Sequence, residues 1–116
     1  MKLLFFSFIT CLFATSLSAQ QVSITFQVDM TEEGANPAGV FIAGSFQGWA
    51  PGASQLLDGD GDGIFTHTAI VDINTTIQWK YLNGPSWDNE ESVPPACGNP
   101  SDNNNRTFDV IDSDEV

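Results

Sequence analysis

Two tryptophans lie in loop-like sequence, where their side chains could bind a ligand. Trp49 ends the stretch AGSFQGW and Trp87 lies in NGPSWDNEE, so Gly, Pro, Ser or Asn residues flank both. An indole in such a setting is difficult to bury, and its exposed face can stack on the apolar CH face of a sugar ring. The alternative is that each Trp closes one end of the fold as part of the core. Two such residues beside polar donors favour a ligand site.

An aspartate-rich loop is a second group with possible chemistry. Asp58, Asp60 and Asp62 alternate with glycines in LDGDGDGIF, which matches the opening of an EF-hand calcium loop. The match fails at the twelfth position, where Ala69 replaces a bidentate Glu, and strand-like sequence flanks the loop. We therefore rank a glycine-rich hairpin loop ahead of a weak calcium site, which would stabilise the loop without performing chemistry.

Catalytic groups are scarce. The one histidine, His67, lies in the middle of a strand-like segment, and no serine or cysteine has a recognisable nucleophile motif. Glu90 and Glu91 are adjacent, so in an extended chain they point to opposite faces and do not flank one glycosidic bond. We therefore predict a protein that is not an enzyme, although it could serve as an accessory module of one.

The N-terminal sequence predicts export. Lys2 is followed by an uncharged run over residues 3–13 and then by small residues that end at Ala19. This pattern is typical of a secretory signal peptide, and it is too short for a membrane-spanning helix. We expect residues 1–19 to be removed, with cleavage after Ser18 as the alternative. Residues 20–116 would then be secreted, or held at the cell surface or in the periplasm, without further membrane insertion.

The expected mature chain is strongly acidic. It keeps Lys80 and Arg106 as its basic residues, against all 15 Asp and Glu residues of the sequence. Nucleic acid and anionic membranes are excluded as partners on this ground, because both require basic patches. The charge suits a neutral ligand or a divalent cation.

The elements that must position these residues have a hydrophobic period of two. Segment 22–30 places Val22, Ile24, Phe26, Val28 and Met30 on one face and polar residues on the other. Four more strand segments, 39–45, 63–73, 76–84 and 106–112, are bounded by Gly, Asn, Pro or Asp, and no window has a helical stripe. This pattern predicts one all-β domain, an antiparallel β-sandwich of immunoglobulin-like, early-set type.

Three motifs together resemble a known family. They are VFIAGSFQGW, IQWKYLNGPSW and NNNRTFDV, and the resemblance extends from Val22 to Val110. It is to the glycogen- and starch-binding carbohydrate-binding modules found in the β subunit of AMP-activated protein kinase and fused to α-glucan enzymes. The segments VSITFQVDM, DGDGDGIF and ESVPPACG look like a secreted version that is common in Bacteroidetes proteins. The resemblance implies a non-catalytic module that binds a starch- or glycogen-type α-glucan.

The resemblance also implies roles for four residues. Trp49 would stack on a glucose ring, Lys80 would donate to sugar hydroxyls, and Trp87 would form a second stacking platform. Asn105 would complete the site, with the run of asparagines at 103–105 leaving the register open by one residue. A neutral glucan presents hydroxyls and CH faces, so two indoles and a few donors suffice without charge pairing.

The sequence departs from this family in three respects. The acidic loop and segment 88–102 have no counterpart in the kinase module, so the rim of the site could differ. Lys80 lies near Asp88, Glu90 and Glu91 in the sequence and could be salt-bridged instead of free. Cys97 is the only cysteine of the expected mature chain. We favour a truncated chain, from which a sorting tail or catalytic domain is missing, over an unpaired thiol.

The sequence therefore leaves two functions open. The first is carbohydrate binding on the loop tryptophans. The second is a structural or adhesion β-sandwich of a secreted or cell-surface protein, with no sugar site. The second predicts that both loop indoles are buried.

Overall fold

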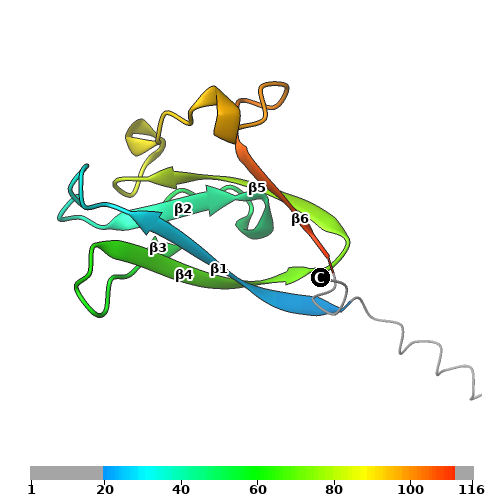
Figure 1. Ribbon diagram of the computed structural model, residues 1–116, viewed down its shortest axis with the longest axis horizontal. Coiled ribbons are helices and arrows are strands. Elements are labelled where there is room, and N and C mark those ends of the chain that lie inside the picture. Colours follow the sequence, from blue (N-terminus) through cyan, green and yellow to red (C-terminus); the bar gives the residue numbers. More distant parts are fainter. Residues whose placement is uncertain (1–19, 112–116) are drawn as a thin grey trace, which may run out of the picture.

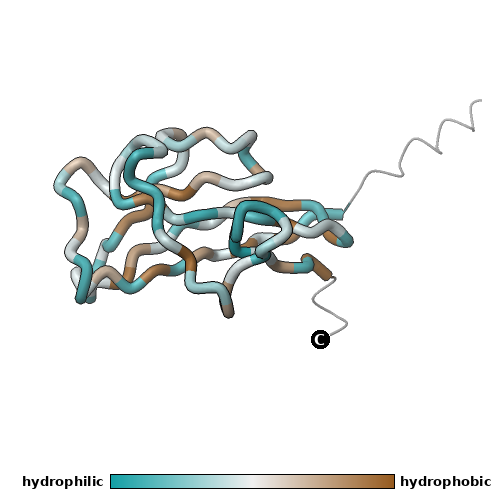
Figure 2. Tube along the Cα trace, turned by 90° about the horizontal axis from the view of Figure 1, so that it is seen from above, coloured by the Kyte–Doolittle hydropathy of each residue, from teal (hydrophilic) through white to brown (hydrophobic). Residues whose placement is uncertain are grey.

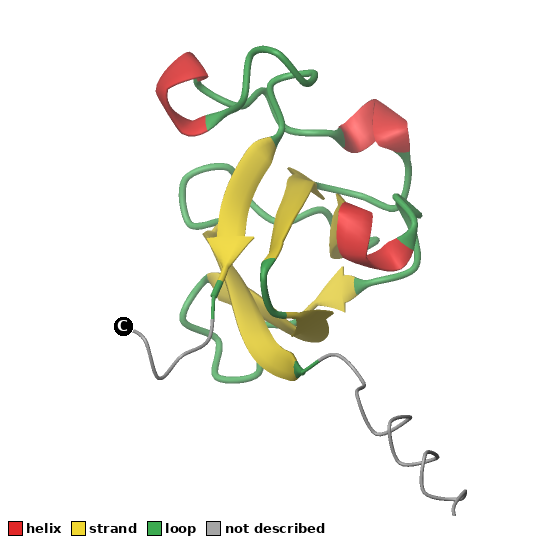
Figure 3. Cartoon of the chain, turned by 90° about the vertical axis from the view of Figure 1, so that its right-hand side faces the viewer, coloured by secondary structure: helices red, strands yellow, loops and turns green. Residues whose placement is uncertain are grey.

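The structure is a computed structural model in which residues 20–111 are described, so the predicted signal peptide lies outside the described residues (Figure 1). Six strands and three one-turn 3-10 helices make up this part of the chain. The strands are β1 (Gln21–Asp29), β2 (Val40–Gly44), β3 (Gln55–Leu56), β4 (Ile64–Asp72), β5 (Thr75–Leu82) and β6 (Arg106–Val110). The short helices, which lie outside the sheets in Figure 3, are η3 (Ser45–Gln47), η4 (Trp87–Asn89) and η5 (Pro95–Cys97). Within residues 20–111, no helix has the length and apolar character needed to cross a bilayer.

The strands form two antiparallel sheets. β1 pairs with β4, and the second sheet has the strand order β3-β2-β5-β6. The sheets are joined on one side, because Leu56 pairs with β2 whereas Leu57 exchanges two 2.9 Å hydrogen bonds with Thr66 of β4. The predicted all-β antiparallel sandwich is confirmed. β3 was not predicted, since two residues are too few to show a period.

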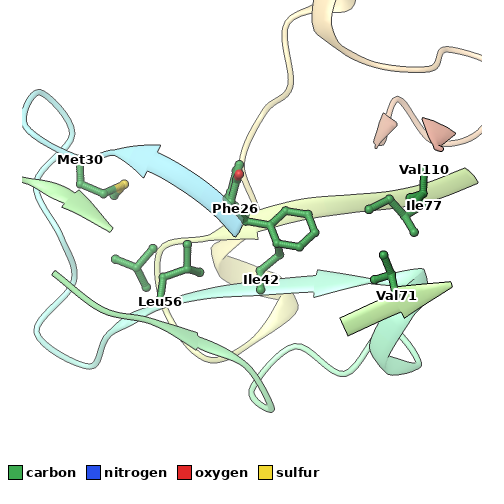
Figure 4. Close-up of a cluster of buried hydrophobic side chains, with 9 residues drawn as sticks. Phe26, Met30, Ile42, Leu56, Val71, Ile77 and Val110 are labelled. Carbon is green, nitrogen blue, oxygen red and sulfur yellow. The ribbon is translucent and has the colours of Figure 1, made fainter. Parts of the chain in front are cut away.

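The core lies between the sheets (Figure 4). The predicted inward face of β1 is confirmed, with Phe26 and Met30 buried and Val22, Ile24 and Val28 packed against them. Phe46 stacks on Phe26 with ring centroids 5.0 Å apart, and Trp79 meets the same ring edge-on at 5.0 Å. Hydrophobic and hydrophilic segments alternate along the Cα trace (Figure 2). Burial of each large apolar side chain in this core stabilises the folded state by about 1.5–3 kcal/mol.

β2 differs from the other strands because all five of its residues are buried. Val40 and Ile42 face the core between the sheets. Phe41 and Ala43 face the opposite way and form a second small cluster with Leu82 of β5, against which Trp49 packs. The outer face of the four-stranded sheet is therefore covered at this end, and the loops that cover it carry the candidate site.

Candidate functional site

An open groove of about 660 Å³ lies on the outer face of the four-stranded sheet. Its floor includes Gln78 and Lys80, which alternate along β5 with the core-facing Ile77, Trp79 and Tyr81. The four residues predicted for the site, Trp49, Lys80, Trp87 and Asn105, all line this groove. The chain thus brings them together from β5 and from three separate loops.

Trp49 is held at the end of the turn after β2. Its φ is +60°, an uncommon angle for a bulky residue, and its N–H donates to the carbonyl of Gly44 at 2.9 Å. The Gln47 side chain organises this turn: Oε1 accepts from the N–H groups of Gly44 (3.2 Å) and Ala50 (2.7 Å). Its Nε2 donates to the carbonyls of Ile42 (3.2 Å) and Ala50 (2.9 Å). Gln47 is a residue that the sequence reasoning missed.

A glycine is required where this turn leaves the strand. A Cβ on Gly44 would clash with the edge of the Phe46 ring and lie 2.9 Å from the carbonyl oxygen of Gln78. Its absence lets Phe46 fold back onto Phe26 in the core while the chain carries Trp49 over the outer face. Phe46 therefore packs against the core, whereas Trp49 packs on the outer face of the sheet.

Trp87 lies in η4, the short helix after β5. The Ser86 side chain accepts from the N–H of Asp88 at 3.3 Å, and Asn89 Oδ1 accepts from the N–H of Ser86 at 3.3 Å. The side chain of Trp87 is 39% exposed, so it is not the buried indole that a structural module requires. Its ring centroid lies 6.3 Å from that of Trp49, with 32° between the ring planes. The two indoles therefore form one adjoining aromatic surface.

An asparagine network fixes the loop that carries Trp87. Asn83 at the end of β5 donates from its backbone N–H to Asn89 (2.9 Å) and from Nδ2 to Gly34 (3.0 Å). In return its Oδ1 accepts from the N–H of Asn36 at 2.7 Å. The loop after β1 thus supports the loop after β5. Sequence reasoning missed these contacts as well.

The two adjacent glutamates diverge, as predicted. Glu90 Oε2 lies 3.0 Å from Lys80 Nζ in the groove. Glu91 binds Arg106 through two hydrogen bonds of 2.8 Å and also accepts from the N–H of Tyr81 at 2.9 Å. Arg106 pairs with Trp79 in the sheet, so it belongs to the core-facing side, where its guanidinium lies 5.5 Å from the Tyr81 ring centroid. The hydrogen bonds to Glu91 raise the pKa of the Arg106 guanidinium above its usual value.

The asparagine run before β6 now has a definite register. Asn103 and Asn105 line the groove, whereas Asn104 points away and donates from Nδ2 to the carbonyl of Val93 at 2.6 Å. Asn105 is only 6% exposed, and its side chain makes no hydrogen bond with any residue in 20–111. Its amide thus offers a donor and an acceptor to the groove. Beside it, Gln78 Nε2 donates to Asp102 Oδ2 at 2.7 Å.

The aspartate loop is closed by its own hydrogen bonds. Asp58 accepts from the N–H groups of Asp62 (3.1 Å) and Gly63 (2.9 Å), and Asp62 accepts from that of Ile64 (2.9 Å). The bond from Gly63 lowers the pKa of Asp58. Carboxylate oxygens of Asp58, Asp60 and Asp62 lie within 4.8 Å of one another. These contacts agree with the hairpin loop that we ranked first, and the calcium site stays a prediction.

Two other residues singled out in the sequence do not line the groove. His67 lies on β4, opposite Phe26 of β1. Cys97 is exposed at the end of η5 and forms no disulfide within residues 20–111. Neither residue adds a reactive group to the site.

Comparison with known proteins adds no family to these observations. No protein-family model matches the chain, and no curated protein is significantly similar to it. Function must therefore be inferred from the chemistry of the groove.

Proposed function

We propose that this chain is a non-catalytic carbohydrate-binding module that holds a neutral, starch- or glycogen-type α-glucan in the groove of Trp49 and Trp87. The observation that carries the proposal is the adjoining pair of indoles, 6.3 Å apart, in a groove that also holds unpaired polar groups. The indoles would stack on the CH faces of successive sugar rings. The sequence resemblance supports the choice of an α-glucan.

Polar groups around the indoles would bind the sugar hydroxyls. The Asn105 amide lines the groove and makes no hydrogen bond within residues 20–111, and the Ser45 hydroxyl, which accepts from the N–H of Gln78 at 3.1 Å, also lines it. Lys80 uses one N–H on Glu90 and keeps two for a ligand. Because the groove is open, a bound oligosaccharide stays partly hydrated. We expect a Kd between about 1 µM and 1 mM, or about −8 to −4 kcal/mol.

The carboxylates of the groove support binding over catalysis. Glycoside hydrolysis uses two carboxyl groups, one as an acid and one as a base or nucleophile. Here Glu90 is ion-paired with Lys80, and Asp102 accepts from Gln78. We therefore assign no bond cleavage to the module. The N-terminal pattern would direct the module out of the cytoplasm. A fused or associated α-glucan enzyme would be a suitable partner, because it acts on the same polysaccharide.

A direct test is affinity gel electrophoresis of the mature chain, with Cys97→Ser to prevent oxidation, in gels with and without glycogen. We expect glycogen to retard the protein and Trp87→Ala to abolish the retardation. Phe108→Ala is the matched control, because Phe108 is also an exposed aromatic, at 49%, but lies outside the groove. Equal mobility of the parent protein with and without glycogen would contradict the proposal.

One observation favours the alternative, a structural or adhesion module. The outer face of the β1-β4 sheet carries three exposed apolar residues, Leu57 (62%), Ile70 (59%) and Ile64 (36%). Such a patch can bind another protein. If this face carries the function, Ile70→Ser should abolish association with a partner, whereas Trp87→Ala should leave it unchanged.

A further inference from the structure

The charges of the groove suggest which glycans it rejects. Residues 20–111 contain two basic side chains, Lys80 and Arg106, and both are ion-paired. Arg106 is bound to Glu91 on the core-facing side of the sheet, away from the groove. Lys80 lines the groove, but its side chain is only 14% exposed and Glu90 holds it at 3.0 Å. An anionic ligand would find no free cation in this part of the chain.

The remaining charges would repel such a ligand. Glu90 neutralises Lys80, and Asp102 is left at the groove with only a neutral hydrogen bond from Gln78. An acidic sugar bound to the remaining N–H groups of Lys80 would also face the carboxylates of Glu90 and Asp102, which line the same groove. Specificity often depends on such repulsion of the wrong ligand as much as on attraction of the right one.

We propose that Glu90 is a specificity-determining residue, which holds Lys80 in an ion pair so that the groove accepts uncharged glycans and rejects acidic ones. This inference rests on the proposed function, because it assumes that the groove binds a glycan. It adds that the Glu90 carboxylate, with a smaller contribution from Asp102, decides the charge class of that glycan.

The negative charge of Glu90 can be removed without loss of the contacts that Glu90 makes to the fold. Its N–H donates to the carbonyl of Trp87 at 3.2 Å, and it bridges to Leu82 of β5, so its backbone secures the loop that carries the indole. Glu90→Gln keeps these backbone contacts, and its amide oxygen can still accept from Lys80. It removes only the negative charge. Asp88, two residues earlier, is exposed and does not line the groove, so Asp88→Asn removes the same charge from the same loop as a control.

The test compares two ligands that differ only at C6 of their glucose units: maltoheptaose, and maltoheptaose oxidised there so that its glucose units carry carboxylates. Calorimetric titration at low salt should show the mature protein binding the neutral oligomer at least about tenfold more tightly. Glu90→Gln should reduce this ratio to about threefold or less, and Asp102→Asn should reduce it in part. Asp88→Asn should keep the ratio of the parent protein. High salt should weaken the discrimination, because it screens the repulsion.

The outcomes separate the two proposals. Equal affinity of the parent protein for both oligomers would overturn the role of Glu90 and leave carbohydrate binding standing. A ratio that Glu90→Gln does not change, in a variant shown to be folded by circular dichroism, would also overturn it, whatever the effect of Asp102→Asn. Binding of neither oligomer would overturn the proposed function and this inference with it.

Discussion

In both sheets, alternate residues of the strands face outward, but the outward apolar residues are exposed on one sheet and buried on the other. On the β1-β4 sheet, the outward apolar residues stay in solvent, with Leu57 62% and Ile70 59% exposed. On the four-stranded sheet, the outward Phe41 is 8% exposed and Ala43 and Leu82 are fully buried. The difference comes from loops, which cover one face and leave the other bare.

The covering loops also carry most of the unusual backbone conformations. Four non-glycine residues in the described chain have positive φ, and Trp49, Asn103 and Asn104 among them lie in loops that border the groove. Such conformations persist only where surrounding contacts enforce them. The bare face instead has regular cross-strand pairs, such as Thr25 and Thr68 with their hydroxyls 2.9 Å apart. The strands thus provide the floor of the groove, including Lys80, and the loops provide the other three proposed site residues.

The largest effect should come from removing the residue that holds the Trp49 turn. Gln47→Ala leaves the N–H and carbonyl groups of Gly44, Ala50 and Ile42 without their side-chain partner. Unsatisfied groups cost about 1 kcal/mol or more each, so we expect unfolding in urea to require about 2–3 kcal/mol less, together with loss of glycan binding. A loss below about 0.5 kcal/mol would show that the turn does not depend on Gln47.

Replacing Trp87 should separate binding from stability. Because the side chain is 39% exposed, Trp87→Ala should lower the free energy of unfolding by less than about 1 kcal/mol. It should nevertheless weaken binding of maltoheptaose at least about tenfold, because one of the two stacking rings is lost. Titration calorimetry and urea unfolding on the same preparation check both parts. Unchanged affinity in the folded variant would place the site elsewhere.

A smaller, pH-dependent effect is expected at the aspartate loop, which lies outside the groove. The bond from Gly63 lowers the pKa of Asp58 in the folded state below its unfolded value of about 3.9. The carboxylate therefore stabilises the fold above that pH, and its contribution is lost as the pH falls through the folded pKa. Asp58→Asn should have a lower Tm than the parent protein at pH 7, and the difference should fade toward pH 2. A difference in Tm that does not vary with pH would contradict this role, and glycan binding at pH 7 should not change.

The smallest effect is expected on the bare face. Thr68→Ala removes one exposed cross-strand hydrogen bond to Thr25, which should cost about 0.5 kcal/mol in urea unfolding. Binding of maltoheptaose should be unaffected. A loss of affinity in this variant would mean that the β1-β4 face takes part in binding, which would remove the distinction between the two faces.

Most of the fold could be predicted from the sequence, because the alternation of apolar and polar residues along a strand is a local signal. Five strands could be recognised in this way, and the inward side of β1 followed from the positions of Phe26 and Met30. The four proposed site residues could be selected from loop context and resemblance. Gln47 and Asn83 could not, because their partners are backbone atoms whose positions are set by the folded turns. The sequence also offered Lys80 three acidic neighbours, and only the folded loop shows that Glu90 is its partner.

The most direct test uses the three tryptophans of the chain as separate probes. Each indole N–H gives its own signal in a ¹⁵N–¹H correlation spectrum of a protein that comprises residues 20–116, and maltoheptaose can be added stepwise. Carbohydrate binding in the groove predicts that the signals of Trp49 and Trp87 shift with one Kd, whereas that of Trp79, whose Nε1 is buried, stays in place. A spectrum in which neither groove indole moves at millimolar ligand would contradict the proposed function.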